Sequence, residues 1–131
     1  MADYEIPEKL RYTADDEWVR AEDDRVVVGV TDFAQQQLGD VVYVELPEIG
    51  AEITRGGAFG VIESVKAVSD LIAPITGSVV AMNAGLADRP EAVNEDCYGE
   101  GWMIAVSPSD ASEVDALFGA EAYLESVRER A

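Results

Sequence analysis

The chain has 131 residues, and its 27 acidic and 9 basic side chains give a formal net charge of −18. This length suits a single domain, and an apolar content of 48% argues against disorder despite the charge. The absence of histidine excludes a Ser-His-Asp triad, a Cys-His pair and any metal site built on histidine. The negative charge also disfavours binding to nucleic-acid backbones or anionic lipid.

Cysteine usage and the N-terminus indicate the compartment. The single cysteine, Cys97, excludes an intrachain disulfide and a CxxC site, so we expect a reducing, cytoplasmic location. The N-terminal segment has no apolar signal core, and no apolar run is long enough to predict a membrane span. The high net charge disfavours self-association, so we expect a monomer.

Acidic residues are spread along the whole chain, and Lys9 and Lys66 are its only lysines. Such a composition is typical of proteins from salt-loving organisms, in which dissolved salt screens the self-repulsion of the chain. The alternative interpretation of the acidic clusters is calcium binding, but the sequence has no D-x-[DN]-x-[DN]-G loop. We therefore predict a halophilic source.

Up to Pro108, short apolar and β-branched runs alternate with Gly and Pro turns, a pattern that predicts strands. A short helix at 33–38, capped by Thr31 or Asp32 and stopped by Gly39, interrupts them. After Pro108 the apolar spacing becomes helical, which predicts helices at 111–118 and 120–130 on either side of Gly119. The expected strands are 17–20, 25–30, 41–46, 57–63, 68–73, 77–82 and 102–106.

These elements predict a mainly β fold, a sandwich or flattened barrel with short helices, two of them at the C-terminus. We expect one domain over 1–131, with a core at about 10–107 and C-terminal helices at about 110–129. Residues 45–53 and 72–80 both carry P-x-x-G after a strand. A two-fold repeat would make the segment between them a hairpin near the symmetry axis, whereas P-x-x-G is also common turn chemistry.

Lys66 is unusual in this chain, whose other cations except Lys9 are arginines. It stands between Val65 and Ala67 in an expected exposed turn, and exposed valine beside a lone lysine indicates that a partner recognises the tip. Lysine differs from arginine in being an amine that can be acylated. The alternative is a surface lysine paired with Glu63 or Asp70.

The segment from Glu63 to Asp70, Glu-Ser-Val-Lys-Ala-Val-Ser-Asp, resembles the lipoylation motif of the glycine cleavage H-protein family. The resemblance covers roughly residues 10 to 127 in order. A biotin carrier normally has methionine on both sides of its lysine, where this chain has Val65 and Ala67. The other similar segments are 16–19, 29–35, 38–47, 73–77, 93–96, 98–102 and 120–123.

The resemblance implies a lipoyl-domain-like hybrid barrel-sandwich that carries lipoate in amide linkage on Lys66. In that family the arm accepts an aminomethyl group from glycine at a decarboxylase, the P protein. The arm passes this group to an aminomethyltransferase, the T protein, and is reoxidised by dihydrolipoamide dehydrogenase, the L protein. A lipoate-attaching enzyme is the fourth implied partner. The chain itself is then a carrier and not an enzyme.

The resemblance also assigns roles to individual residues. The carboxylates of Glu17 and Asp70 match those that lie near the loaded arm in related proteins, where they would hold a cationic amine. Glu63 resembles the acidic residue that lipoylating enzymes recognise; its other interpretation is a solvated strand residue. Gly77, eleven residues after Lys66, would serve close backbone packing or a turn with positive φ, and so fix the tip indirectly.

Four positions depart from the family pattern: Asp15, Asp16, Gln37 and Cys97. Asp16 and Gln37 stand where members of the family have histidine. Asp15 would either strengthen the hold on the amine or simply belong to the acidic surface, which we favour. We expect Cys97 to be a small core filler, because it has no basic neighbour to activate its thiol.

The remaining aromatic and glycine signals point to structure. We expect Trp18 and Trp102 in the core because both fall in predicted strands. The Gly56 to Gly60 stretch is not followed by a helix with a lysine, so we reject nucleotide binding. Two other functions remain possible: a donor that relays lipoyl groups to other lipoate-dependent enzymes, and a binding module whose Lys66 is unmodified.

Overall fold

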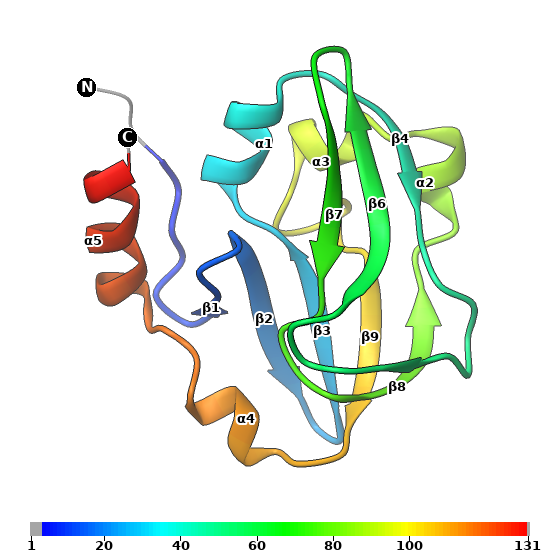
Figure 1. Ribbon diagram of the computed structural model, residues 1–131, viewed down its shortest axis with the longest axis vertical. Helices are drawn as coiled ribbons and strands as arrows, with labels where there is room; N and C mark the ends of the chain where they lie inside the picture. The colour runs from blue at the N-terminus through cyan, green and yellow to red at the C-terminus, as the bar shows by residue number, and fades with distance from the viewer. Residues whose placement is uncertain (1–3, 131) are drawn as a thin grey trace.

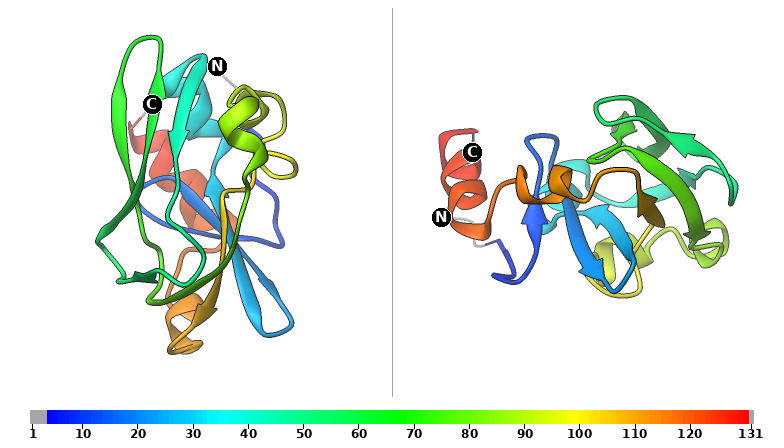
Figure 2. Two further views of the ribbon diagram at one scale, coloured as in Figure 1. Left: turned by 90° about the vertical axis from the view of Figure 1, so that its right-hand side faces the viewer. Right: turned by 90° about the horizontal axis from the view of Figure 1, so that it is seen from below.

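The computed structural model of the chain describes residues 4–130. Within that range, antiparallel strands form two sheets that face each other (Figures 1 and 2). The larger sheet has the order β1-β2-β3-β9-β8-β5 and the smaller one the order β4-β6-β7. The strands are β1 (Arg11–Tyr12), β2 (Glu17–Glu22), β3 (Arg25–Val30), β4 (Val41–Glu45), β5 (Glu52–Ile53), β6 (Ala58–Ser64), β7 (Val68–Ile72), β8 (Gly77–Met82) and β9 (Ile104–Pro108).

The described range also contains five helices: α1 (Asp32–Leu38), α2 (Gly85–Asp88), α3 (Ala92–Glu95), α4 (Ser112–Asp115) and α5 (Ala120–Arg130). Thr31 caps α1 by accepting a hydrogen bond from the amide of Ala34, and Gly39 ends the helix with φ of 78°. This confirms Thr31 over Asp32 as the cap and explains the glycine, since φ > 0 strains other residues.

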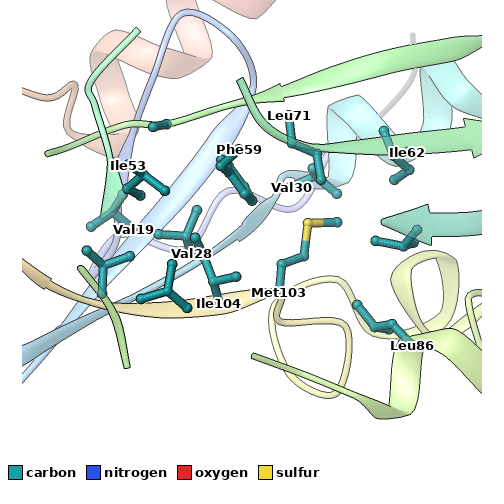
Figure 3. Close-up of a cluster of buried hydrophobic side chains, with 14 of the residues drawn as sticks. Val19, Val28, Val30, Ile53, Phe59, Ile62, Leu71, Leu86, Met103 and Ile104 are labelled. Carbon is teal, nitrogen blue, oxygen red and sulfur yellow. The ribbon is translucent and has the colours of Figure 1, made fainter. Parts of the chain in front are cut away.

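The main core lies between the two sheets and is drawn in Figure 3. It includes Val28 and Ile104 of the larger sheet and Ile62 and Leu71 of the smaller one. A second cluster lies on the opposite face of the larger sheet, where Tyr12 stacks on Tyr123 of α5 with ring centroids 4.7 Å apart. Because both faces of β3 are covered, its central residues are an unbroken run of valines rather than an alternating pattern.

The predicted mainly β sandwich with two C-terminal helices is confirmed, and the two sheets do not close into a barrel. The helix predicted at 111–118 is wrong in length, because Phe118 instead pairs with Tyr12 in a β-bridge. The last strand begins at Ile104, two residues later than predicted. Short elements without a pattern of their own, namely β1, β5, α2 and α3, were not predicted.

Candidate functional site

Lys66 lies at the tip of the β6–β7 hairpin, which forms the upper end of the molecule in Figure 1. The side chain of Ser64 closes the turn, since its Oγ accepts hydrogen bonds from the amides of Lys66 (3.3 Å) and Ala67 (3.1 Å). The amide of Ser64 donates to the carbonyl of Ala67 at 2.8 Å. The turn thus holds Lys66 exposed at a fixed place. Within residues 4–130, neither Glu63 nor Asp70 forms an ion pair with Lys66.

The tip is fastened to the segment that follows α1. The amide of Val65 donates to the carbonyl of Asp40 at 3.0 Å. The aliphatic part of the Lys66 side chain lies close to Gly39, which ends α1. A Cβ added to Gly39 would be 3.5 Å from Cε of Lys66. The position of Lys66 therefore depends on the path of the chain through 39–41.

Asn94 of α3 holds that segment in place. Its Nδ2 donates to the carbonyl of Gly39 (2.8 Å) and to Oε1 of Gln35 (3.0 Å), and its Oδ1 accepts from the amide of Val41 (2.8 Å). The sequence places Asn94 only within segment 93–96, which is similar to the family, and predicts no role for it. No local signal identifies it, because its partners are 53 to 59 residues away.

Glu17 opens β2 and is buried, with 2% of its surface exposed. Its Oε2 accepts a 2.7 Å hydrogen bond from the amide of Ile72 at the end of β7. Its Oε1 is buried and has no hydrogen-bond partner among the described residues. The backbone around it is fixed by Thr13, whose Oγ accepts from the amides of Asp15 and Glu17.

Burial raises the pKa of Glu17 from its ordinary 4.5 to about 9, and the nearby charges of Asp15 and Asp16 add to this effect. The hydrogen bond from Ile72 acts in the opposite direction but does not offset the burial. At neutral pH Glu17 is therefore protonated in the structure as it stands. A group that is buried, partly unsatisfied and strongly shifted in pKa is a candidate functional residue when it faces a cavity.

Glu17 lines a cavity of about 200 Å³ between α1, the start of β2 and the strand β7. Asp70 lines the same cavity, so the structure brings together the two predicted carboxylate residues. The alternation of β7 places Ser69 and Leu71 on its inner side and Asp70 on its exposed outer side, which puts Asp70 at the rim. Gln37 of α1 also lines this cavity, and so does Asp15, which sequence reasoning assigned to the general acidic surface.

Glu63 and Gly77 lie apart from this cavity. Glu63 is half-buried on β6, in register with Tyr43 on one side and Val68 on the other. Gly77 begins β8, after β7 has led the chain away from the tip, and its backbone runs against β9. A Cβ at Gly77 would overlap the carbonyl oxygen of Ser107 and lie 2.7 Å from Cγ1 of Val106. Close packing, and not a positive φ, is thus the reason for glycine here.

Asp16 has a structural role that the sequence did not reveal. Its carboxylate accepts hydrogen bonds from Arg130 at 2.7 and 3.0 Å and from the hydroxyl of Tyr123 at 3.0 Å, and so fastens α5 beside the cavity. Tyr123 in turn shares a 2.6 Å hydrogen bond with Thr31. At this position, where the family frequently has histidine, Asp16 thus pairs with the cation of Arg130 on α5.

The remaining predictions about single residues mostly hold. Cys97 is buried, and burial raises the pKa of its thiol to about 12, which agrees with a filler rather than a nucleophile. Trp18 is fully buried and donates a 2.9 Å hydrogen bond to the carbonyl of Cys97. The prediction for Trp102 is wrong in part, because Trp102 lies before β9 rather than in a strand; it is only half-buried and packs against the second cluster.

Comparison with known proteins gives a consistent result. The model of the family described as Glycine cleavage H-protein matches residues 10–130. The chain belongs to this family. Glycine cleavage system H proteins of Anaeromyxobacter sp. (strain K) and Geobacillus sp. (strain WCH70) are 57% and 58% identical to it. The two alignments cover 96% and 94% of this chain, and 98% and 97% of the relatives.

A solved structure extends this similarity to the fold. A glycine cleavage system H protein from Mycobacterium marinum superposes with a TM-score of 0.84 at 41% identity, over 92% of this chain and 97% of that one. The predicted H-protein resemblance and the carrier function in the glycine cleavage system are therefore confirmed. None of the helices in the described range is long and apolar enough to cross a membrane. The halophilic source stays a prediction.

Proposed function

We propose that Nζ of Lys66 carries lipoate in amide linkage. The turn presents Lys66 exposed, and no ion pair within residues 4–130 competes for its amine. In the attachment step the deprotonated Nζ attacks the carbonyl carbon of an activated lipoyl ester or anhydride. The C–N bond forms, the bond to the leaving group breaks, and Nζ gives up a proton. Amide formation removes the charge of Lys66, so the arm can lie against apolar surface.

The cavity beside the hairpin is the resting place for what the arm carries. The lipoyl group supplies a disulfide that takes up an aminomethyl unit, and the amine of that unit is cationic at neutral pH. The Oε1 of Glu17, which has no partner among the described residues, supports this role most directly, because a buried polar oxygen without a hydrogen-bond partner is costly unless a ligand supplies one. Asp70 at the rim adds a second carboxylate.

The approach of a cation lowers the pKa of a carboxyl group, so Glu17 would ionise as the amine enters and would then pair with it. Apolar residues that line the same cavity, namely Val30, Ile62 and Leu71, exclude water around this pair. Exclusion of water slows hydrolytic loss of the cargo. The chain itself thereby binds, orients and shields the cargo, while the chemistry occurs on the partner enzymes.

The partners in this proposal are the P, T and L proteins of the glycine cleavage system and the lipoate-attaching enzyme. Glu63, three residues before Lys66, contributes to recognition by the last of these. Gly77 acts indirectly, because its close packing on β9 fixes the strand that follows β7. We place the protein in the cytoplasm as a single-domain monomer that is a carrier and not an enzyme.

A lipoyl donor that serves other enzymes is the alternative. It shares Lys66 but has no amine to hold, so it gives no reason for a buried carboxyl oxygen of Glu17 that has no partner among the described residues. The binding module without modification predicts that Lys66 is replaceable by arginine.

The decisive experiment combines intact mass, peptide mapping and the glycine–bicarbonate exchange reaction of the P protein. One lipoyl group on the Lys66 peptide, and complete loss of exchange in Lys66→Arg but not in Lys9→Arg, support the proposal. An unmodified Lys66 in a host that makes lipoate, or full exchange activity in Lys66→Arg, overturns it.

A further inference from the structure

Strand β4 contains an irregularity beside the hairpin that carries Lys66. Its register with β6 shifts between Val41 and Tyr43, because Val41 pairs with Ser64 and Tyr43 with the adjacent Glu63. Val42 is the extra residue of this β-bulge. As a result Val42 and Tyr43 are both exposed, by 52% and 47%, although neighbours on a regular strand point to opposite faces. Bulges of this kind redirect side chains next to functional sites.

The redirected side chains join others near Lys66. Tyr43, Glu63 and Val68 are direct cross-strand neighbours on the outer face of the smaller sheet. Val68 and Val65 flank the lysine turn, and they are 67% and 69% exposed. We call the group Val42, Tyr43, Val65 and Val68 the tip patch. A chain this strongly charged has no solubility reason to gather exposed apolar residues around one lysine.

Acidic residues border the tip patch. Glu63 stands between Tyr43 and Val68, and the next row across the sheet contains Glu45 and Asp70 on either side of Val61. Within residues 4–130 none of these three carboxylates forms an ion pair. The complementary surface is therefore an apolar pocket edged by arginine or lysine.

The length of the Lys66 side chain indicates which partner enzyme must contact the residues beside the turn. Enzymes that use the finished arm can meet it far from the hairpin, because the arm is long and flexible. The enzyme that builds the amide must bring its acyl group to Nζ itself, at the end of a four-carbon stem. Residues beside the turn therefore lie in the interface with the lipoate-attaching enzyme. The same residues distinguish Lys66 from Lys9.

We infer that the tip patch, with the Val42–Tyr43 bulge at its centre, is the docking surface for the lipoate-attaching enzyme. This inference rests on the proposed lipoylation of Lys66. Tyr43 is its main anchor, because a partly exposed aromatic ring offers a large rigid contact area at an interface. The partner's pocket receives Tyr43, and its cations pair with Glu63.

The test measures initial rates of lipoylation of the unmodified chain by a lipoate-attaching enzyme supplied with lipoate and ATP. The variants are Tyr43→Ser and the double variant Val42→Ser, Tyr43→Ser. We expect the double variant to lose about tenfold or more in kcat/KM, as truncation of a central aromatic contact does. Tyr43→Phe keeps the ring and should restore the rate. Ile49→Ser removes an apolar side chain outside the patch that is more exposed (66%) than Val42 or Tyr43, and it should leave the rate unchanged.

Thermal unfolding of each variant separates docking from folding, since exposed substitutions should change the midpoint little. Wild-type rates in the folded double variant overturn the inference, while Lys66 still becomes lipoylated and the proposed function stands. If the wild-type chain takes up no lipoyl group on Lys66, the proposed function itself fails. The double variant could instead be lipoylated at the wild-type rate and then react slowly with the P protein. That result assigns the patch to the P protein and also overturns the inference.

Discussion

The amide of Ile72 donates a 2.7 Å hydrogen bond to the carboxyl group of Glu17, which lies 55 residues earlier in the chain. This bond joins the first residue of β2 in the larger sheet to the last residue of β7 in the smaller one. It satisfies Oε2, whereas Oε1 is buried without a hydrogen-bond partner among the described residues, and the Glu17 side chain lines the cavity. The same contact that connects the two sheets thus prepares a buried carboxyl group for a ligand.

Glu17 should make stability depend on pH. Its folded pKa of about 9 exceeds its ordinary 4.5, so between these values the folded chain holds a proton that the unfolded chain has lost. This contribution is complete below pH 4.5 and disappears as the pH rises through about 9. In urea unfolding, the free energy of wild type relative to Glu17→Gln should fall with pH by up to about 1.4 kcal/mol per unit. Parallel pH profiles for the two proteins would contradict a raised pKa.

The two cavity carboxylates should prolong the life of the loaded carrier. Charge-assisted hydrogen bonds are worth about 1.5–3 kcal/mol, so Glu17→Gln with Asp70→Asn should speed the loss of the aminomethyl cargo by about tenfold or more. Release of ammonia or formaldehyde from the purified loaded protein measures the decay. Asp40→Asn, an exposed carboxylate near the tip that does not line the cavity, is the control. If the double variant decays as slowly as wild type, these carboxylates do not hold the cargo.

Asn94 should position Lys66 from a distance. Asn94→Asp keeps the acceptor for Val41 but sets a carboxylate against the carbonyl of Gly39, which costs about 1–3 kcal/mol. Faster hydrogen exchange at the amide of Val65 and slower lipoylation of Lys66 are the expected results. Asn83→Asp is the matched control, because Asn83 donates in the same way to the carbonyls of Glu100 and Trp102. Equal exchange at Val65 in both variants would remove the positioning role.

Gly77 should not accept a side chain. Gly77→Ala forces a Cβ against the carbonyl of Ser107, and overpacking of this kind costs about 1–3 kcal/mol in the free energy of unfolding. Gly119→Ala, where a Cβ meets nothing within 4 Å and φ is not positive, should change the free energy of unfolding by less than about 1 kcal/mol. Denaturant unfolding compares the two. A tolerated alanine at Gly77 would show that β8 and β9 can move apart.

Salt should stabilise the protein if its source is halophilic. The Debye length falls from about 10 Å at 0.1 M salt to about 3 Å at 1 M, which screens repulsion among the unpaired carboxylates. The thermal midpoint should therefore rise steadily from low to multimolar KCl. Sucrose, which is excluded from protein surfaces but does not screen charge, serves as the control. Equal stability in low salt would exclude the halophilic interpretation.

Local patterns in the sequence determined the strands, the hairpin turn and the exposure of Lys66. Alternation and β-branched runs fix which residues form strands, and Gly or Ser at a turn acts on its immediate neighbours. The lysine and its flanking residues could be recognised for the same reason, because their chemistry lies within a few consecutive residues.

Only the tertiary structure decided the surroundings of that lysine. Three hydrogen bonds there join residues more than 50 positions apart: Ile72 to the buried Glu17, Asn94 to Gly39, and Arg130 of α5 to Asp16. The Val42–Tyr43 bulge depends on how β4 meets β6, and Phe118 leaves its predicted helix because Tyr12 offers a backbone partner. Burial and pairing depend on what lies opposite in space, and the neighbours of a residue in the sequence do not carry that information.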